Sequence, residues 1–132
     1  MLLGDVLKKR DSGGMFECAD ADVDSGRLRD GELVVTGPMF GHKMRTPTPG
    51  TAPFEREREL LSRYEIDAQS FRKFGKLAVG TRRALSVVPA DATADACDDT
   101  ALRVSFSLPA GAYATAVLRE IRKPSPDPES RK

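Results

Sequence analysis

The amino-acid sequence predicts an α+β fold with too few regular elements to look like a self-contained domain. Near the C-terminus, a strand that alternates apolar and polar residues leads directly into a helix with one apolar stripe. The N-terminal part holds short apolar runs separated by segments rich in glycine and proline. The length of 132 residues suits one small domain or a piece of a larger one.

Composition and charge are those of a globular protein. Apolar residues make up 39% of the chain, charged residues make up 31%, and the formal net charge is +1. Charge balance therefore does not indicate a nucleic-acid binder, and any basic surface has to come from local clustering. No apolar run approaches the ~20 residues of a membrane helix, and the N-terminal apolar stretch is too short for a signal peptide. Because Cys18 and Cys97 are expected to be ordinary thiols, we expect a cytoplasmic protein without a membrane partner.

The N-terminal part is expected to contain two short strands. Residues 4–10 predict the first strand, residues 15–18 are a second short apolar run, and residues 20–30 fit either a helix or an acidic loop. Residues 33–36 predict the second strand. Glycine, proline and threonine then fill residues 36–53, so we expect neither a long helix nor a central strand there.

Two helices are predicted in the middle of the chain. Thr51 is a capping residue and Pro53 fits the first turn of the first helix. The apolar residues of this helix, which we expect to form its buried face, are Phe54, Leu60, Leu61 and Tyr64. The second helix begins after Asp67 and ends at Gly75, with two phenylalanines on one face.

The C-terminal part predicts two strands and a helix. Residues 81–88 form the first strand, and residues 89–100 form a polar, acidic connection. Leu102–Leu108 is the clearest strand of the chain, with one apolar and one polar face. The apolar stripe of the following helix consists of Ala114, Val117, Leu118 and Ile121. Pro124 ends this helix, and residues 124–132 are expected to be a disordered tail.

The motifs of metal and nucleophilic sites are not matched. Asp20, Asp22 and Asp24 resemble the start of a calcium loop, but Ser25 and Gly31 stand where that loop needs glycine and glutamate. We therefore expect solvated acidic residues near a helix start. The single histidine, His42, supports neither a catalytic triad nor a zinc site, and no cofactor is expected.

Two features bear on ligand binding. Arg82 and Arg83 are adjacent, so on a strand they point to opposite faces. Either one arginine is ion-paired and the other exposed, or at least one of them contacts a phosphate group of a ligand. Tyr113 is expected in the first turn of the last helix, off its apolar stripe. Its ring either contacts a ligand near the positive helix end or packs partly buried.

Four segments, in the same order, resemble the tRNA pseudouridine synthase D family. FSLPAGAYATAVLREI resembles the signature that closes members of that family. VTGPMFGHKM, the glutamate-rich FEREREL and VGTRRALSVVP resemble three earlier family segments. The resemblance runs from about Gly4 to Arg122.

The resemblance implies a uridine isomerase that acts on tRNA without a cofactor or metal. Its nucleophile would be an aspartate in a motif that nothing in this chain matches, so we assign no catalytic residue and expect the chain alone to be inactive. By resemblance, residues 1–88 would belong to an inserted module specific to this family. Residues 89–123 would be the last strand and helix of the catalytic domain. The remaining alternative is an RNA-binding remnant without chemistry.

The resemblance also implies roles for individual residues. Tyr113 stands where the family has an aromatic residue that lines the uridine pocket. Arg82, Arg83 and Arg119 are the candidates for RNA contacts, and Glu120 completes a family Arg-Glu pair with Arg119. Ala112 departs from a frequent family serine, so a hydroxyl cap at the helix start would be lost.

Overall fold

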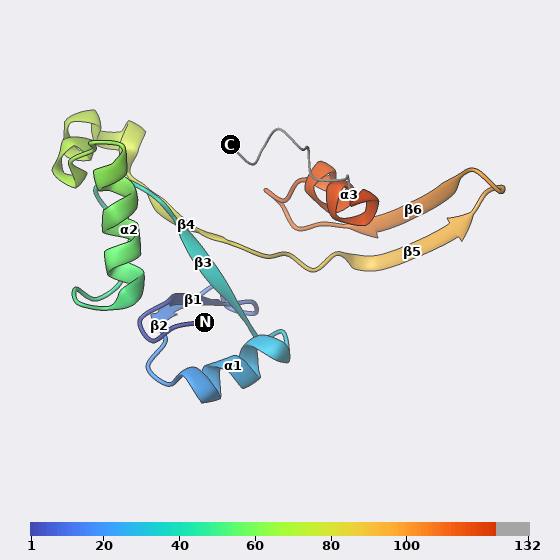
Figure 1. Cartoon of the computed structure of the whole chain (residues 1–132), viewed down its shortest axis with the longest axis horizontal. Coiled ribbons are helices and arrows are strands. Elements are labelled where there is room, and N and C mark those ends of the chain that lie inside the picture. Colours follow the sequence, from blue (N-terminus) through green and yellow to red (C-terminus); the bar gives the residue numbers. More distant parts are fainter. Residues whose placement is uncertain (124–132) are drawn as a thin grey trace. The chain divides into compact units, whose positions relative to one another are not determined.

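The computed structural model describes residues 1–123, which divide into two compact units after Ser86 (Figure 1). The first unit combines a four-stranded sheet with three helical segments. The second unit holds a two-stranded sheet and one helix. The α+β fold class is thus confirmed, whereas the expected tail at residues 124–132 lies outside the described residues.

The sheet of the first unit is antiparallel throughout. Its strands are β1 (Val6–Lys9), β2 (Met15–Glu17), β3 (Leu33–Met39) and β4 (Thr81–Ala84). They are arranged in the order β2-β1-β3-β4, so that β1 and β3 are central. The strand that we expected over residues 81–88 is therefore shorter, because its pairing with β3 ends at Ala84.

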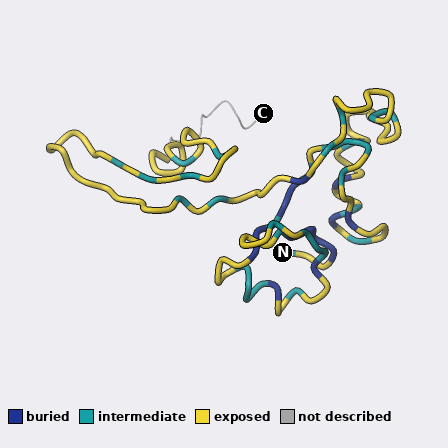
Figure 2. Tube along the Cα trace, turned by 180° about the vertical axis from the view of Figure 1, so that it is seen from behind, coloured by how far each residue is buried: buried dark blue, intermediate teal, exposed yellow. Residues whose placement is uncertain are grey.

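The core of the first unit lies on one face of this sheet, under α1 (Ala21–Arg29). Leu7 is paired with Phe16 on one side and with Val35 on the other, and paired residues share a face. Fully buried Leu7 and Leu33 form the centre, against which partly buried side chains of α1 pack. Figure 2 shows this buried centre as the dark segments around the N-terminus.

Helix α1 resolves the ambiguity of the acidic segment at residues 20–30. The Asp20 carboxylate accepts from the backbone N–H groups of Asp22 and Val23, so it caps the helix. Asp24, however, is only 6% exposed and pairs with Arg27. The expectation of solvated acidic residues is therefore wrong for Asp24, because the helix turns this carboxylate toward the sheet.

Strand β3 extends beyond residue 36, where the sequence predicts its end. Thr36 to Met39 continue the strand and pair with β4, although glycine and proline stand at positions 37 and 38. The pairing of β3 with β1 involves Leu33 to Val35 only. Proline is tolerated at position 38 because this end of β3 pairs on one side only and needs no second ladder of hydrogen bonds.

Helix α2 (Ala52–Arg63) starts after Thr51, with Pro53 in its first turn as predicted, but the Thr51 hydroxyl donates to the carbonyl of Thr48 and does not cap the helix. Its buried face also differs from the predicted one. The buried residues are Pro53 and Glu57, whereas Leu60 is 39% exposed and Tyr64 is 68% exposed. The prediction of an apolar buried face is therefore wrong for Leu60 and Tyr64, whereas Phe54 and Leu61 are half-buried. Glu57 is buried because it pairs with a buried arginine, as described below.

A 3-10 segment, η1 (Ala68–Ala78), connects α2 to β4. Asp67 caps it as the sequence predicts, whereas Gly75, with a left-handed backbone (φ 51°), interrupts the segment but does not end it. Its end is held by Gly80, which lies so close to Gly41 that a Cβ at Gly80 would be 2.6 Å from the Cα of Gly41. Only glycine fits at this approach.

The second unit contains β5 (Ala90–Ala96), β6 (Leu102–Ser107) and α3 (Ala114–Arg122). The expected polar connection at residues 89–100 is wrong, because most of it forms β5 and pairs antiparallel with β6. The alternation in β6 is retained, with Val104 and Phe106 half-buried and their neighbours exposed. No residue between 87 and 123 is buried. None of the described helices is long and apolar enough to cross a membrane.

Candidate functional site

The side chain of Arg82 is fully used inside the first unit. Its Nε donates to Thr36 Oγ1 at 2.8 Å, and its two terminal nitrogens bind the Glu57 carboxylate at 2.7 and 3.3 Å. The same nitrogens also donate to the carbonyl oxygens of Thr36 and Arg45. These five contacts match the five N–H donors of a guanidinium group, and the side chain is 2% exposed. All the donors of Arg82 therefore stabilise the first unit itself.

Arg83 lies on the opposite face of the sheet and is exposed. It is paired with Gly37, and the next residue on that face of the strand, Leu85, covers the space that a side chain at Gly37 would fill. The structure thus agrees with the first alternative from the sequence, in which one arginine is ion-paired and the other is exposed. Arg83 remains a candidate RNA contact, whereas Arg82 does not present its guanidinium to solvent.

Tyr113 lies at the junction between β6 and α3. It is the N-cap residue of α3, one position before the first turn in which we expected it, and it is 65% exposed. Its backbone carbonyl accepts from the N–H of Ala116. A hydroxyl at Ala112 would therefore stand before the cap, so the expected loss of a cap at that position is wrong. The side chain of Tyr113 is thus largely exposed at this junction.

Arg119 is exposed in the last turn of α3, and its carbonyl accepts from the N–H of Lys123. Within residues 1–123, no ion pair joins Arg119 or Glu120 to another side chain. The structure therefore places Tyr113 and Arg119 in the second unit and Arg83 in the first. It does not bring the three residues into one described cavity.

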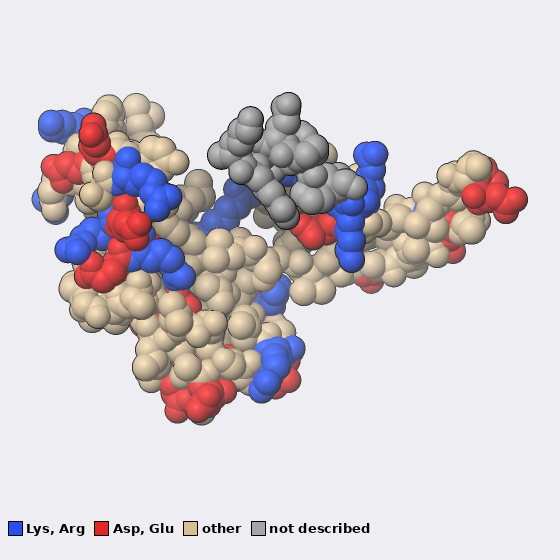
Figure 3. Space-filling model, in the orientation of Figure 1, with Lys and Arg blue, Asp and Glu red and all other residues tan. Residues whose placement is uncertain are grey.

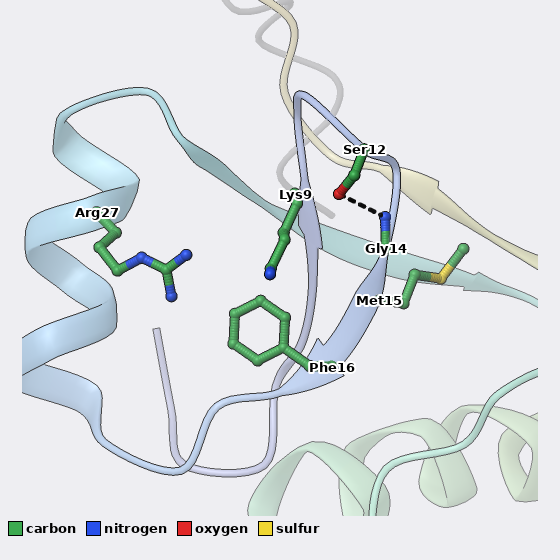
Figure 4. Close-up of a pocket in the computed structure, with 6 residues that line it drawn as sticks. All are labelled: Lys9, Ser12, Gly14, Met15, Phe16 and Arg27. Carbon is green, nitrogen blue, oxygen red and sulfur yellow. Dashed lines mark hydrogen bonds between the residues drawn. The ribbon is translucent and has the colours of Figure 1, made fainter.

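A hollow of about 360 Å³ opens beside the β1–β2 turn (Figure 4). Lys9, Phe16 and Arg27 point into it, and the Arg27 guanidinium lies 5.7 Å from the centre of the Phe16 ring. Arg27 also binds Asp24 and Glu32 at 3.3 and 3.0 Å, which raises its pKa and offsets its charge.

Besides the predicted arginines, the structure shows a group of exposed cations in η1 that the sequence analysis missed. Arg72, Lys73 and Lys76 are all exposed, and residues 68–83 contain no aspartate or glutamate. A count of charges in this window would have found the group. It was hidden by the net charge of +1 of the whole chain.

The fold matches part of a solved structure. A crystal structure of a tRNA pseudouridine synthase D from Methanosarcina mazei superposes with a TM-score of 0.65 and 27% sequence identity. The match covers 94% of this chain and 32% of that one. These values place the chain, by its fold, among the pseudouridine synthases.

The chain belongs to the tRNA pseudouridine synthase D (TruD) family, whose model matches residues 1–121. It is 45% identical over 120 residues to the tRNA pseudouridine synthase D of an Anaeromyxobacter species, covering 91% of this chain and 33% of that protein. It is 41% identical over 121 residues to the corresponding protein of Geotalea daltonii, covering 91% of this chain and 30% of that protein. The family that the sequence motifs predicted is thus confirmed, and the chain spans about a third of the length of these relatives.

Proposed function

We propose that this chain is a part of a tRNA pseudouridine synthase that supplies substrate contacts for the isomerisation of uridine to pseudouridine in tRNA. The observation that carries the proposal is the family match over residues 1–121, which includes both units. The chemistry would come from an aspartate outside the matched motifs of this chain. No metal or cofactor enters the proposed reaction.

The role proposed for Tyr113 is to stack on the target base after it leaves the RNA helix. A base that leaves its stack loses contact with its neighbours, and an aromatic ring restores about 1–3 kcal/mol per base. Tyr113 is 65% exposed at the start of α3, so its ring is accessible. The backbone N–H groups of the first helical turn stand next to it and can donate to carbonyl or phosphate oxygens.

Arg83 and Arg119 are proposed to contact the phosphate backbone. Both side chains are exposed, one on β4 and one on α3. Phosphate contacts fix the register of an RNA without reading its sequence, so these residues would position the tRNA while the base pocket selects the uridine. Arg82 is left out of this role because its donors are occupied by Thr36, Glu57 and Arg45.

We further propose that the two units correspond to two parts of the complete enzyme. Residues 1–88 would lie in the inserted module and residues 89–123 would complete the catalytic domain. The separation of the compact units after Ser86 supports this division. So does the lack of any buried residue between 87 and 123, because the apolar side chains of β6 and α3 need further layers to cover them.

The test is a chimaera in which this chain replaces the matching third of the Anaeromyxobacter relative. We expect it to convert uridine in tRNA, and we expect Tyr113→Ala to lower kcat/KM by about 5- to 150-fold while Tyr113→Phe retains most activity. Tyr64→Ala is the matched control, because Tyr64 is 68% exposed but lies at the end of α2. Equal effects of Tyr113→Ala and Tyr64→Ala would refute the pocket assignment.

The alternative, an RNA-binding remnant without chemistry, makes a different prediction for the same chimaera. It would bind tRNA but form no pseudouridine, even with the relative's catalytic aspartate in place. The short coverage of 33% of the relative's length is the observation that keeps this alternative open.

A further inference from the structure

The segment at residues 68–83 has a charge distribution unlike that of the rest of the first unit. Five of its residues are lysine or arginine and none is aspartate or glutamate. The donors of Arg82 are occupied by contacts within the first unit, whereas Arg72, Lys73 and Lys76 are exposed. Within the described part of the chain, no carboxylate forms an ion pair with any of these three exposed cations.

The neighbouring helix α2 is the internal comparison. It also carries several arginines, but each described one is paired with a carboxylate. Arg58 binds Glu55 at 2.6 Å and Arg63 binds Glu59 at 3.1 Å. Figure 3 shows the result as blue and red side chains that alternate along this helix. The charge of α2 is therefore balanced locally, and that of η1 is not.

An exposed aromatic ring lies among the unpaired cations. Phe74 is 59% exposed and stands between Lys73 and Lys76 in the chain. The left-handed turn at Gly75 separates two short helical pieces, so this surface is not one continuous amphipathic helix. Cations beside an exposed aromatic side chain are the combination with which proteins hold single-stranded nucleic acid.

The end of this segment is anchored to the first unit. The backbone N–H and the Nδ1 of His42 both donate to the carbonyl of Ala78, at 3.0 and 2.9 Å. The N–H of Lys43 donates to the carbonyl of Val79 at 2.8 Å, next to the close approach of Gly80 to Gly41. Because these contacts fix the end of the yellow-green coil after α2 in Figure 1, a ligand would have less of it to order.

We propose that η1 is an RNA-contact surface on which Arg72, Lys73 and Lys76 bind phosphates and Phe74 stacks on an unpaired base. This inference rests on the proposed function for the identity of the RNA, tRNA. It adds a second contact region to the one proposed at Tyr113, and it extends the binding role of the first unit beyond Arg83. An anionic membrane would also attract these cations, but the broken helix lacks the long apolar face of a membrane-surface helix.

The experiment measures binding of fluorescent tRNA to the 132-residue chain by anisotropy between 50 and 200 mM salt. The variant Arg72→Ala/Lys76→Ala removes two cations from η1, and Arg58→Ala/Arg63→Ala removes two from α2. We expect the first double variant to reduce the slope of log affinity against log salt by about 1.5 and to weaken binding about tenfold. The second double variant, which loses only balanced charges, should change neither value appreciably.

A third variant tests the ring. Phe74→Leu keeps an apolar side chain but removes the aromatic face, so we expect affinity to fall about fivefold or more at an unchanged salt slope. The inference is overturned if the two double variants weaken binding equally, or if the unmodified chain shows no tRNA affinity at 50 mM salt. Preferential binding to phosphatidylserine–phosphatidylcholine vesicles over tRNA would also overturn it, in favour of a membrane.

Turnover of the chimaera separates this inference from the proposed function. If both hold, Arg72→Ala/Lys76→Ala raises KM and leaves kcat nearly unchanged, because these residues do not touch the reacting base. A chimaera that binds tRNA through η1 but forms no pseudouridine would refute the proposed function alone. Full turnover with an unchanged KM in the double variant would refute the inference alone.

Discussion

Arg82 and Glu57 form a buried, two-pronged ion pair between β4 and α2, with N···O distances of 2.7 and 3.3 Å. The Thr36 hydroxyl extends this contact, since it accepts from Arg82 and donates to the carbonyl of Val6 at 2.6 Å. Helix α2, strand β4 and the two central strands are thus connected through buried polar groups. A buried pair of this kind depends on both partners.

Glu57→Ala is expected to destabilise the first unit by about 3–5 kcal/mol, because it leaves the Arg82 guanidinium buried without its counter-charge. Urea denaturation of the chain, followed by circular dichroism, measures this loss. Glu59→Ala is the control on the same helix, because its pair with Arg63 is exposed and should contribute at most about 1 kcal/mol. Similar midpoints for the two variants would show that the buried pair is not a main support of α2.

Gly80→Ala is expected to destabilise the first unit by at least about 1–3 kcal/mol. The residue has a φ of 76°, and a Cβ there would be 2.6 Å from the backbone of Gly41. Gly26→Ala is the opposite case, since Gly26 lies within α1 and no atom stands within 4 Å of its Cβ position. It should stabilise the chain by about 0.5–1 kcal/mol. Thermal melts that rank the two variants in the reverse order would contradict this account of the Gly41–Gly80 contact.

The stability of the first unit is expected to fall at alkaline pH. Burial, together with the nearby Asp24 carboxylate, raises the pKa of the Cys18 thiol above its ordinary value of 9.0. The folded chain therefore keeps this proton when the unfolded chain has lost it. The contribution to stability is complete below pH 9.0 and is lost as pH rises through the folded pKa. Urea midpoints between pH 7 and 10.5 measure it, and Cys18→Ala should flatten this part of the profile.

The two thiols also provide an internal check by chemical labelling. Cys97 is exposed in the second unit, whereas Cys18 is 3% exposed. A thiol-specific reagent at pH 8 should modify Cys97 rapidly and Cys18 only after local opening. Equal labelling rates in the native chain would mean that Cys18 is not held in the core.

Hydrogen exchange is expected to distinguish the two units. The amides of β1 and β3 lie beside fully buried Leu7 and Leu33 and should be well protected. The β5–β6 pair has no buried residue, and an isolated hairpin is at best marginally stable, so its amides should have protection factors of about 10 or less. Equal protection in both sheets, or one sharp cooperative melt of the entire chain, would contradict this expectation.

The sequence could predict the elements that carry their own local pattern. Strand β6 follows from a period of two, α3 follows from its apolar stripe, and the break in η1 follows from Gly75. Strand β5 could not be found this way, because alanine, aspartate and threonine are mostly weak strand formers. Its structure depends on pairing with β6, which is information held elsewhere in the chain.

The candidate site shows the same limit. Adjacent arginines on a strand predict opposite faces, but not which of them is buried. That choice depends on Glu57, which lies 25 residues before Arg82 and looks like one member of an exposed charged helix. The burial of Glu57 in place of Leu60 and Tyr64 is likewise a tertiary effect, because periodicity ranks residues by hydropathy and cannot anticipate a buried ion pair.

Pro38 affects how readily the edge of β3 can pair with a strand of another chain. Beyond Val35, the side of β3 that faces away from β4 has no strand partner among the described strands. A free strand edge of this type can recruit a foreign strand, which is a frequent start of aggregation. Pro38 has no backbone N–H to donate to an added strand, so the ladder of hydrogen bonds with that strand would be interrupted. Pro38, which the sequence suggested would exclude a strand, thus protects the unpaired edge of β3 against further strand pairing.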